Sequence, residues 1–195
     1  MKRESNNLRA QIGIETLIVF IAMILVAAIA AAILINTQGM LQQQAQRTGE
    51  QSTQQVSTGA KMMSATGNVT GEKVDWVNMT VKLRAGSQNL DFGNATVHYI
   101  DDDTVKDLVY NSTMNGNPST SYYVTNISDA DDSVPVLNSP EDVFKLHFNV
   151  EAISGNALVE GEHATFNIQP AVGQQTMRAV VVPQSVEGQS VIDLT

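Results

Sequence analysis

A nearly uncharged stretch of 24 residues close to the N-terminus constrains this chain more than any other feature. It runs from Ile12 to Ile35 and contains a single ionisable side chain, Glu15. From Leu17 to Ile35 there are 19 consecutive residues without a charged or hydrogen-bonding side chain. At about 1.5 Å of rise per residue, such a helix crosses most of the hydrocarbon core of a membrane. The stretch is apolar on every side, so it must lie in lipid or inside a bundle of helices.

The residues around this stretch argue against an ordinary secretory signal and set its orientation. An ordinary signal has an apolar region of roughly 7 to 15 residues that ends at a small-residue cleavage site, and this run is longer and lacks such an end. Lys2, Arg3 and Arg9 precede the run, whereas the first charge after it is Arg47. The basic end is therefore expected to stay cytoplasmic, with everything after about Thr37 facing outward.

The apolar run and its flanks form one continuous motif. The segment from Arg9 to Gly39 is RAQIGIETLIVFIAMILVAAIAAAILINTQG. It resembles the N-terminal region of archaeal flagellins (archaellins), which are members of the type IV pilin-like superfamily. The resemblance implies that a prepilin-type signal peptidase cuts between Ala10 and Gln11 and leaves the apolar helix on the mature subunit. One position departs from the family pattern, because Glu15 stands where archaellins usually have Gly and bacterial pilins usually have Glu.

The apolar helix is the predicted assembly element. We expect it to be held in lipid before assembly and then buried among identical helices at a filament axis, where small residues let backbones approach closely. Contacts that do not close into a ring give an open helical polymer. The predicted assembly residues on this helix are Ile12, Gly13, Glu15, Leu17, Phe20, Met23, Leu25, Ala28, Ala32 and Ile35.

The sequence leaves two roles open for Glu15. It lies four positions after Gln11 on the same helical face, so it could reach the terminal amine of its own processed chain or of a neighbour. Such a pairing would offset the cost of a carboxylate near apolar surroundings. The carboxylate could instead extend to water at the membrane interface, and cyclisation of a terminal Gln11 would remove the amine altogether.

The chain beyond the apolar run changes character twice. The Gln-, Ser- and Thr-rich segment that follows has no proline, which predicts that the helix continues to about Ser57, with Gly59 as a stop. After Gly67 the apolar residues alternate, which predicts half-buried antiparallel strands. The alternating sets are Val77, Met79, Val81 and Leu83, then Phe144, Leu146, Phe148 and Val150, then Ala164, Phe166 and Ile168; shorter candidate strands are Thr96–Ile100, Thr104–Tyr110, Tyr122–Ile127 and Met177–Val182.

Seven or eight strands at this spacing predict a sandwich or a small barrel. The predicted fold class is α+β, a long N-terminal hydrophobic α-helix followed by an antiparallel β-sandwich domain, which the family resemblance implies is immunoglobulin-like. The predicted division is a removed basic leader at 1–10, an assembly helix at 11–58 and an external β-domain at 59–195.

Five sequons of the form N-x-S/T are candidate N-glycosylation sites. All of them fall in the predicted external domain, and a glycan requires an exposed Asn side chain. Resemblance to archaellins, which are commonly N-glycosylated, supports their use. The candidates are Asn68, Asn78, Asn94, Asn111 and Asn126.

Two acidic groups are the only candidates for a metal ion, and no cofactor is expected. Ca²⁺ takes roughly six to eight oxygen ligands and favours clustered carboxylates, but neither group has an EF-hand loop pattern, so a solvated acidic loop is the alternative. The histidines lie in predicted strands without zinc-site spacing, and no nucleophile elbow, P-loop or dinucleotide motif occurs, so catalysis is not expected. The groups are Asp101, Asp102 and Asp103, then Asp129, Asp131 and Asp132; the histidines are His98, His147 and His163.

Composition completes the functional prediction. The formal charge of −9 argues against nucleic acid as a partner, and the absence of cysteine excludes disulfides. The resemblance to archaellins implies the predicted function, a structural subunit of the archaeal flagellum (archaellum), which is an extracellular filament used for swimming. It also implies a precursor in the cell membrane that depends on a signal peptidase and on assembly and motor machinery. The alternatives are an adhesive pilus subunit of the same superfamily and an uncleaved, membrane-anchored β-sandwich binding protein.

Overall fold

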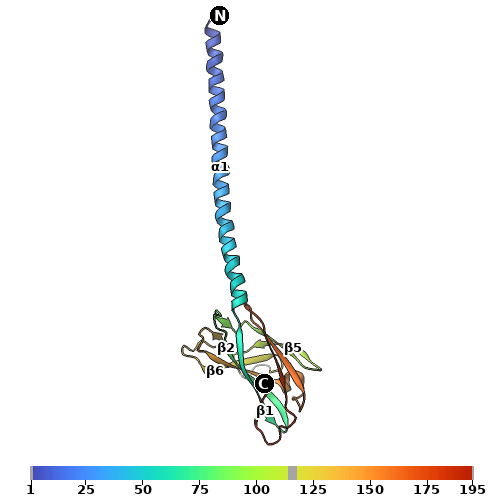
Figure 1. The fold of residues 1–195 in the computed structure, drawn as a ribbon. Coiled ribbons are helices and arrows are strands. Elements are labelled where there is room, and N and C mark those ends of the chain that lie inside the picture. The colour runs from blue at the N-terminus through green and yellow to red at the C-terminus, as the bar shows by residue number, and fades with distance from the viewer. Residues whose placement is uncertain (1, 114–117, 195) are drawn as a thin grey trace. The chain divides into compact units, whose positions relative to one another are not determined.

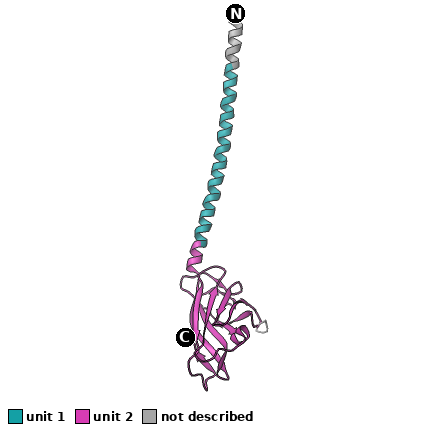
Figure 2. Cartoon of the chain, turned by 90° about the vertical axis from the view of Figure 1, so that its right-hand side faces the viewer, with its two compact units in different colours: residues 1–51 teal, residues 52–195 magenta. Residues whose placement is uncertain are grey.

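The structure, a computed structural model, describes residues 2–113 and 118–194 (Figure 1). For residues 2–11 the description is limited to the helical backbone. The chain divides into two compact units, residues 1–51 and residues 52–195 (Figure 2). The first unit is helical throughout its described part, and the second contains the last helical turns and the whole β-domain.

A single helix, α1, spans Lys2–Ser57. Its sequence is rich in Ala, Leu, Ile, Met and Gln and has no proline, so nothing interrupts the backbone ladder. The hydroxyls of Thr16 and Thr37 donate to the carbonyl oxygens of Ile12 (3.1 Å) and Ile33 (2.8 Å), so neither hydroxyl is unpaired in apolar surroundings. The predicted end of the helix at Ser57 is confirmed.

The β-domain is built from one large sheet and one small one. The large sheet has nine strands in the order β10-β9-β4-β5-β6-β8-β2-β1-β11, and β3 pairs with β7 separately. The strands are β1 (Ala60–Thr70), β2 (Lys73–Leu83), β3 (Leu90–Asp91), β4 (Thr96–Ile100), β5 (Val105–Tyr110), β6 (Ser121–Ser128), β7 (Val136–Leu137), β8 (Val143–Asn149), β9 (His163–Gln169), β10 (Thr176–Val181) and β11 (Val191–Asp193).

One pair of strands departs from the predicted all-antiparallel arrangement. β5 and β6 run parallel, and only two residue pairs, Val109 with Ser121 and Tyr110 with Tyr122, are in register. This short contact joins two antiparallel halves, β10-β9-β4-β5 and β6-β8-β2-β1-β11. The rest of the sheet is antiparallel, as predicted.

The core lies between the two halves of the large sheet. The ring centroids of Phe148 on β8 and Phe166 on β9 are 4.7 Å apart, and Tyr99 on β4 meets Phe166 edge-on at 5.2 Å. Aromatic pairs at these separations stabilise a core beyond their buried area. The alternating residues predicted to face inward on β2, β8 and β9 are buried, which confirms the two-layer packing.

Two local predictions differ from the structure. The sequence around β1 gave no alternating apolar signal, because the inward positions there are small: Ala65 and Gly67 face the core, and a Cβ on Gly67 would lie 2.8 Å from Val74 Cγ1. Val150, expected at the end of a strand, instead begins the short helix α2 (Val150–Ser154). The side chain of Asn149 caps this helix by accepting from the backbone N–H of Ala152 (3.0 Å).

Hydrogen bonds from loops of the β-domain hold the residues that connect α1 to β1. The carbonyl oxygen of Thr58 accepts from the backbone N–H of Gln174 (2.8 Å). The carbonyl oxygen of Gly59 accepts from the backbone N–H of Arg84 (3.0 Å), and its own N–H donates to the Ser87 hydroxyl (2.9 Å). Gly173, just before Gln174, has φ +120°, and a Cβ there would lie 2.6 Å from the Thr58 oxygen.

We expect Gly173→Ala to destabilise the β-domain, on the order of 3 kcal/mol, because the substitution combines an unfavourable φ with a clash against Thr58. Gly188 has φ +74° with open space around it, so Gly188→Ala carries only the conformational cost, about 1 kcal/mol. Thermal unfolding of both variants in detergent measures the difference. Equal losses of stability would show that the contact with Thr58 contributes nothing.

Candidate assembly surface and surface sites

The side chains of α1 are exposed over most of its length. Every residue from 12 to 53 is in the exposed class, including Phe20 at 63% and Leu34 at 68% of their full accessible surface. From Ile12 onward the helix is long and apolar enough to cross a membrane, by length and composition. An apolar surface of this extent is too large for a monomer in water, so it is a site of association with lipid or with other chains.

The predicted assembly residues all lie on this exposed part of α1. Phe20, Met23 and Leu25 are between 57% and 66% exposed, and the other seven residues are in the same exposed class. They occur on all sides of the helix, as expected for an element surrounded by apolar neighbours. The predicted cleavage residues, Ala10 and Gln11, lie within the helical backbone, and their side chains fall outside the described part of the chain.

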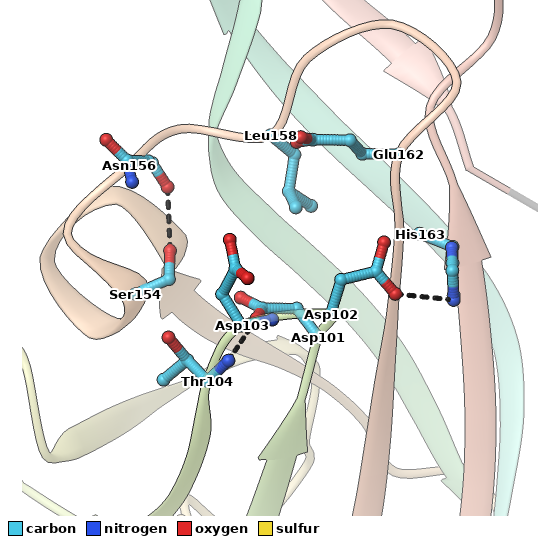
Figure 3. Close-up of a pocket in the computed structure, with 9 residues that line it drawn as sticks. All are labelled: Asp101, Asp102, Asp103, Thr104, Ser154, Asn156, Leu158, Glu162 and His163. Atoms are coloured by element: carbon cyan, nitrogen blue, oxygen red, sulfur yellow. Dashed lines mark hydrogen bonds and ion pairs between the residues drawn. The ribbon is translucent and has the colours of Figure 1, made fainter.

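The side chains of the first predicted acidic group line one hollow together with Glu162 and His163 (Figure 3), but among the described residues their carboxylates do not converge as metal ligands. Asp101 Oδ1 accepts from the backbone N–H groups of Asp103 (2.9 Å) and Thr104 (2.6 Å), and its Oδ2 accepts from the hydroxyl of Tyr99 (2.7 Å). Burial, and then the bond to Asp101, raise the pKa of Tyr99. Asp102 points to His163 instead, with Oδ1 3.4 Å from Nε2. Asp101 thus stabilises its own loop.

The second acidic group contains a different third member from the one predicted. Within the described residues, oxygens of Asp129, Asp131 and Asp142 lie within 4.8 Å of one another, whereas Asp132 is outside the group. Asp142 is only 2% exposed, and Asp129 Oδ2 is buried without a hydrogen-bond partner among the described residues. The amide of Asn138 donates to Asp131 (2.7 Å) and lowers the pKa of that carboxyl. These three carboxylates could hold a hard cation.

The candidate glycosylation residues differ in accessibility. Asn68 on β1, Asn94 before β4 and Asn126 on β6 are exposed, and Asn111 after β5 is half-buried. Asn78 on β2 is only 9% exposed. Its Nδ2 donates to Asn68 Oδ1 (3.2 Å) and its Oδ1 accepts from His147 Nδ1 (2.6 Å), so a glycan on Asn78 does not fit the folded domain.

His147 is held neutral at the centre of the same hydrogen-bond network. An amide oxygen can only accept, so Nδ1 carries the proton and donates to Asn78, while Nε2 accepts from the hydroxyl of Thr125 (2.8 Å). The ring stacks on Tyr123 with centroids 4.3 Å apart and planes 6° from parallel. Burial, and then the charge of Lys145, lower the pKa of His147 from 6.5 to about 4.

Sequence comparison gives the family. A model of the archaeal-type flagellins matches residues 10–178. Flagellin B1 of Halobacterium salinarum is 39% identical to the chain over 186 residues, which cover 95% of both proteins. The chain belongs to the archaeal-type flagellin family. Of the three functions that the sequence left open, this membership supports the structural subunit of an extracellular motility filament.

Solved structures of flagellins share the fold. The archaeal flagellum of Methanospirillum hungatei strain JF1 matches with a TM-score of 0.71 and 18% identity, over 92% of this chain and 99% of that one. The crystal structure of archaeal flagellin FlaB1 from Methanocaldococcus jannaschii matches with a TM-score of 0.63 and 24% identity, over 70% and 96%. Both likenesses confirm a long apolar helix followed by a mostly antiparallel β-domain.

We expect Ca²⁺ to raise the melting temperature of this flagellin through the Asp129–Asp131–Asp142 group, because a bound cation offsets the repulsion of three close carboxylates. Free ligand at about 100 times its dissociation constant adds about 2.7 kcal/mol. Asp129→Asn should abolish the shift, whereas Asp102→Asn, in the other acidic group, should keep it. A melting temperature that is insensitive to Ca²⁺ in the unmodified chain would exclude the site.

We expect the free energy of unfolding to fall as the pH drops from about 6.5 to 4. In this range the unfolded chain binds a proton at His147, whereas the folded chain, in which the pKa of His147 is lowered, does not. Solvent screening at this half-buried group limits the loss to about 1 to 2 kcal/mol. Comparison with His147→Gln, which cannot titrate, isolates this contribution from that of the carboxylates. If the free energy of unfolding changes with pH in the same way in both chains, His147 does not have the lowered pKa.

Proposed function

We propose that this flagellin is made as a membrane-held precursor, is cut between Ala10 and Gln11 by a prepilin-type signal peptidase, and polymerises through α1 from Gln11 to about Ser57. The observation that carries this proposal is the uninterrupted exposure of α1 from residue 12 to residue 53. The apolar part of that surface requires a non-aqueous partner at every stage. Lipid supplies this partner before assembly, and identical helices supply it in the filament.

The size of the apolar surface makes free monomer in water unfavourable. Of the 19 residues from Leu17 to Ile35, 13 are larger than alanine. At roughly 1.5 to 3 kcal/mol per buried side chain, their transfer from water contributes at most about 20 to 40 kcal/mol. When α1 passes directly from lipid into a bundle of helices, its apolar side chains are never exposed to water. The alanines, among them Ala28 and Ala32, allow the close backbone approach on which helix association in apolar media depends.

The remaining proposals concern location and partners. The basic leader stays on the cytoplasmic side, so α1 delivers the acidic β-domain to the outside, where it forms the outer sheath of the filament. The partners are identical subunits, the peptidase, and the assembly and motor machinery, and nucleic acid is not one of them. Resident cofactors are not part of the proposal, apart from the cation expected at Asp129, Asp131 and Asp142.

Catalysis is not part of the proposal either, although one arrangement resembles a catalytic triad in its connectivity. Thr125, His147 and Asn78 are linked as a hydroxyl, an imidazole and an orienting amide. A pKa of about 4 makes His147 a weak general base at neutral pH. The network also lies on the outer face of the sheet, where the Asn78 amide donates to Asn68 Oδ1. We assign it a structural role.

The test is the mass of the chain in filaments sheared from cells. We expect a chain that begins at Gln11, with or without loss of ammonia from the terminal glutamine. The variant Ala10→Leu should block the cut and leave a Met1-starting chain in the membrane, because the peptidase needs a small residue there. Asn7→Leu places the same side chain three residues earlier and should be processed normally.

Three results would contradict the proposal. A Met1 start in sheared filaments would show that polymerisation does not need the cut. An unmodified chain found only in membranes, with its Met1 start, would favour the anchored binding protein. Swimming that is unchanged after deletion of the gene, with loss of surface attachment, would favour the adhesive pilus subunit.

A further inference from the structure

The outer face of the β6-β8-β2-β1 half of the sheet carries a cluster of aromatic rings beside a sequon. Trp76 on β2 and Tyr123 on β6 are 6.0 Å apart between centroids, with planes at 73°, and Tyr123 stacks on His147. Together with Asn68, Asn78 and Lys145 they line a shallow hollow of about 400 Å³. We call these six residues the Trp76 face.

The strand register places Asn68 beside the indole. Asn68 on β1 is the direct cross-strand partner of Trp76 on β2. Side chains of directly opposed residues have Cβ atoms about 4.5 to 5.5 Å apart on the same face of a sheet. Asn68 is exposed, whereas Trp76 is only half-exposed. Any group attached to the Asn68 amide therefore begins next to the Trp76 ring.

The hydrogen-bond network fixes which atom of Asn68 is available. Asn78 Nδ2 donates to Asn68 Oδ1, and Asn78 is itself oriented by His147, whose other ring nitrogen is bound by Thr125. None of the described hydrogen bonds engages Asn68 Nδ2, which is the atom that N-glycosylation modifies. A glycosylated amide keeps its carbonyl oxygen, so the bond from Asn78 survives the modification.

We propose that Asn68 carries an N-linked glycan whose first sugars lie across Trp76 and Tyr123. A sugar ring has an apolar C–H face and polar hydroxyl edges, and the Trp76 face offers aromatic surface ringed by amide, imidazole and ammonium groups. The proposal rests on the proposed export of the β-domain, because the Asn68 amide must meet its sugar donor outside the cytoplasm.

The chemistry is a group transfer from an oligosaccharide linked through phosphate to a lipid. A bond forms between Asn68 Nδ2 and C1 of the sugar, and the bond between C1 and the phosphate oxygen breaks. The electron pair of the broken bond leaves with the lipid phosphate, and the proton that Nδ2 loses balances the negative charge of this released phosphate. Asn78, with both ends of its amide engaged and 9% exposure, stays unmodified although it is also a sequon.

The test removes each sequon through its threonine and leaves both asparagines in place. Thr70→Ala destroys the Asn68 sequon, Thr70→Ser preserves it, and Thr80→Ala destroys the Asn78 sequon. Trypsin separates the two sites, because Asn68 lies in the peptide 62–73 and Asn78 in the peptide 74–82. Peptide masses from sheared filaments should show a glycan on 62–73 in the unmodified chain, Thr70→Ser and Thr80→Ala, and none in Thr70→Ala.

Trp76 is the only tryptophan of the chain, so tryptophan fluorescence reports directly on the Trp76 face. We expect acrylamide quenching to increase about twofold in Thr70→Ala, because the half-exposed indole loses the sugar that covers it, and to stay unchanged in Thr70→Ser and Thr80→Ala. Asn111→Gln, at a second sequon near the aromatic rings, should also leave quenching unchanged.

Several results would overturn the proposal. These are an unmodified 62–73 peptide, a glycan on 74–82, unchanged quenching in Thr70→Ala despite a lost glycan, and increased quenching in Asn111→Gln. Quenching that rises only when Thr70→Ala filaments are depolymerised would show that a second copy of the chain covers Trp76. The same peptides and the same fluorescence can be measured on chain extracted from membranes in detergent. A variant that fails to polymerise is therefore distinguished from one in which no glycan covers the Trp76 face.

Discussion

The need to keep α1 out of water governs the rest of this molecule. Its side chains are exposed from residue 12 to residue 53. The apolar part has no polar face, so it cannot lie as an amphipathic helix at the boundary between membrane and water. A chain with such an element cannot be a free monomer in water, whatever its other domain does. The β-domain has a separate core between the two halves of its sheet, and no described residue of α1 belongs to that core.

Polar residues that belong to the same motif in the sequence have different surroundings in the folded β-domain. Carboxylates that looked alike in the sequence have different environments: Asp101 binds its own loop and Tyr99, while Asp142 is buried beside Asp129 and Asp131. Asn68 and Asn78 belong to sequons of the same N-x-T form on neighbouring strands, yet Asn68 is exposed and both ends of the Asn78 amide are hydrogen-bonded. Accessibility, which the motif does not encode, separates them.

The fold could be predicted from the sequence where one periodicity dominated. Uninterrupted apolarity gave α1, and period-two alternation gave β2, β8 and β9, because one face of each strand is filled by large side chains. β1 could not be predicted, since the close approach of Val74 to Gly67 leaves room only for small residues on its inner face. The parallel β5-β6 contact and the proximity of Asp142 to Asp129 depend on how the intervening loops fold back, which no periodicity of the sequence encodes. The register of β1 and β2 places Asn68 opposite Trp76, and the sequence pattern does not encode that register.

The short passage from α1 to β1 has a mechanical consequence. Only Thr58 and Gly59 separate the end of the helix from Ala60, and both are hydrogen-bonded to loops of the β-domain. Such a connection has no slack, so tension carried along the chain reaches β1 at once. β1 is paired with β2 along its length and with β11 near its far end, so the hydrogen bonds of β1 are the first in the β-domain to carry such a load. The rate of forced unfolding is then set by the step that breaks this pairing.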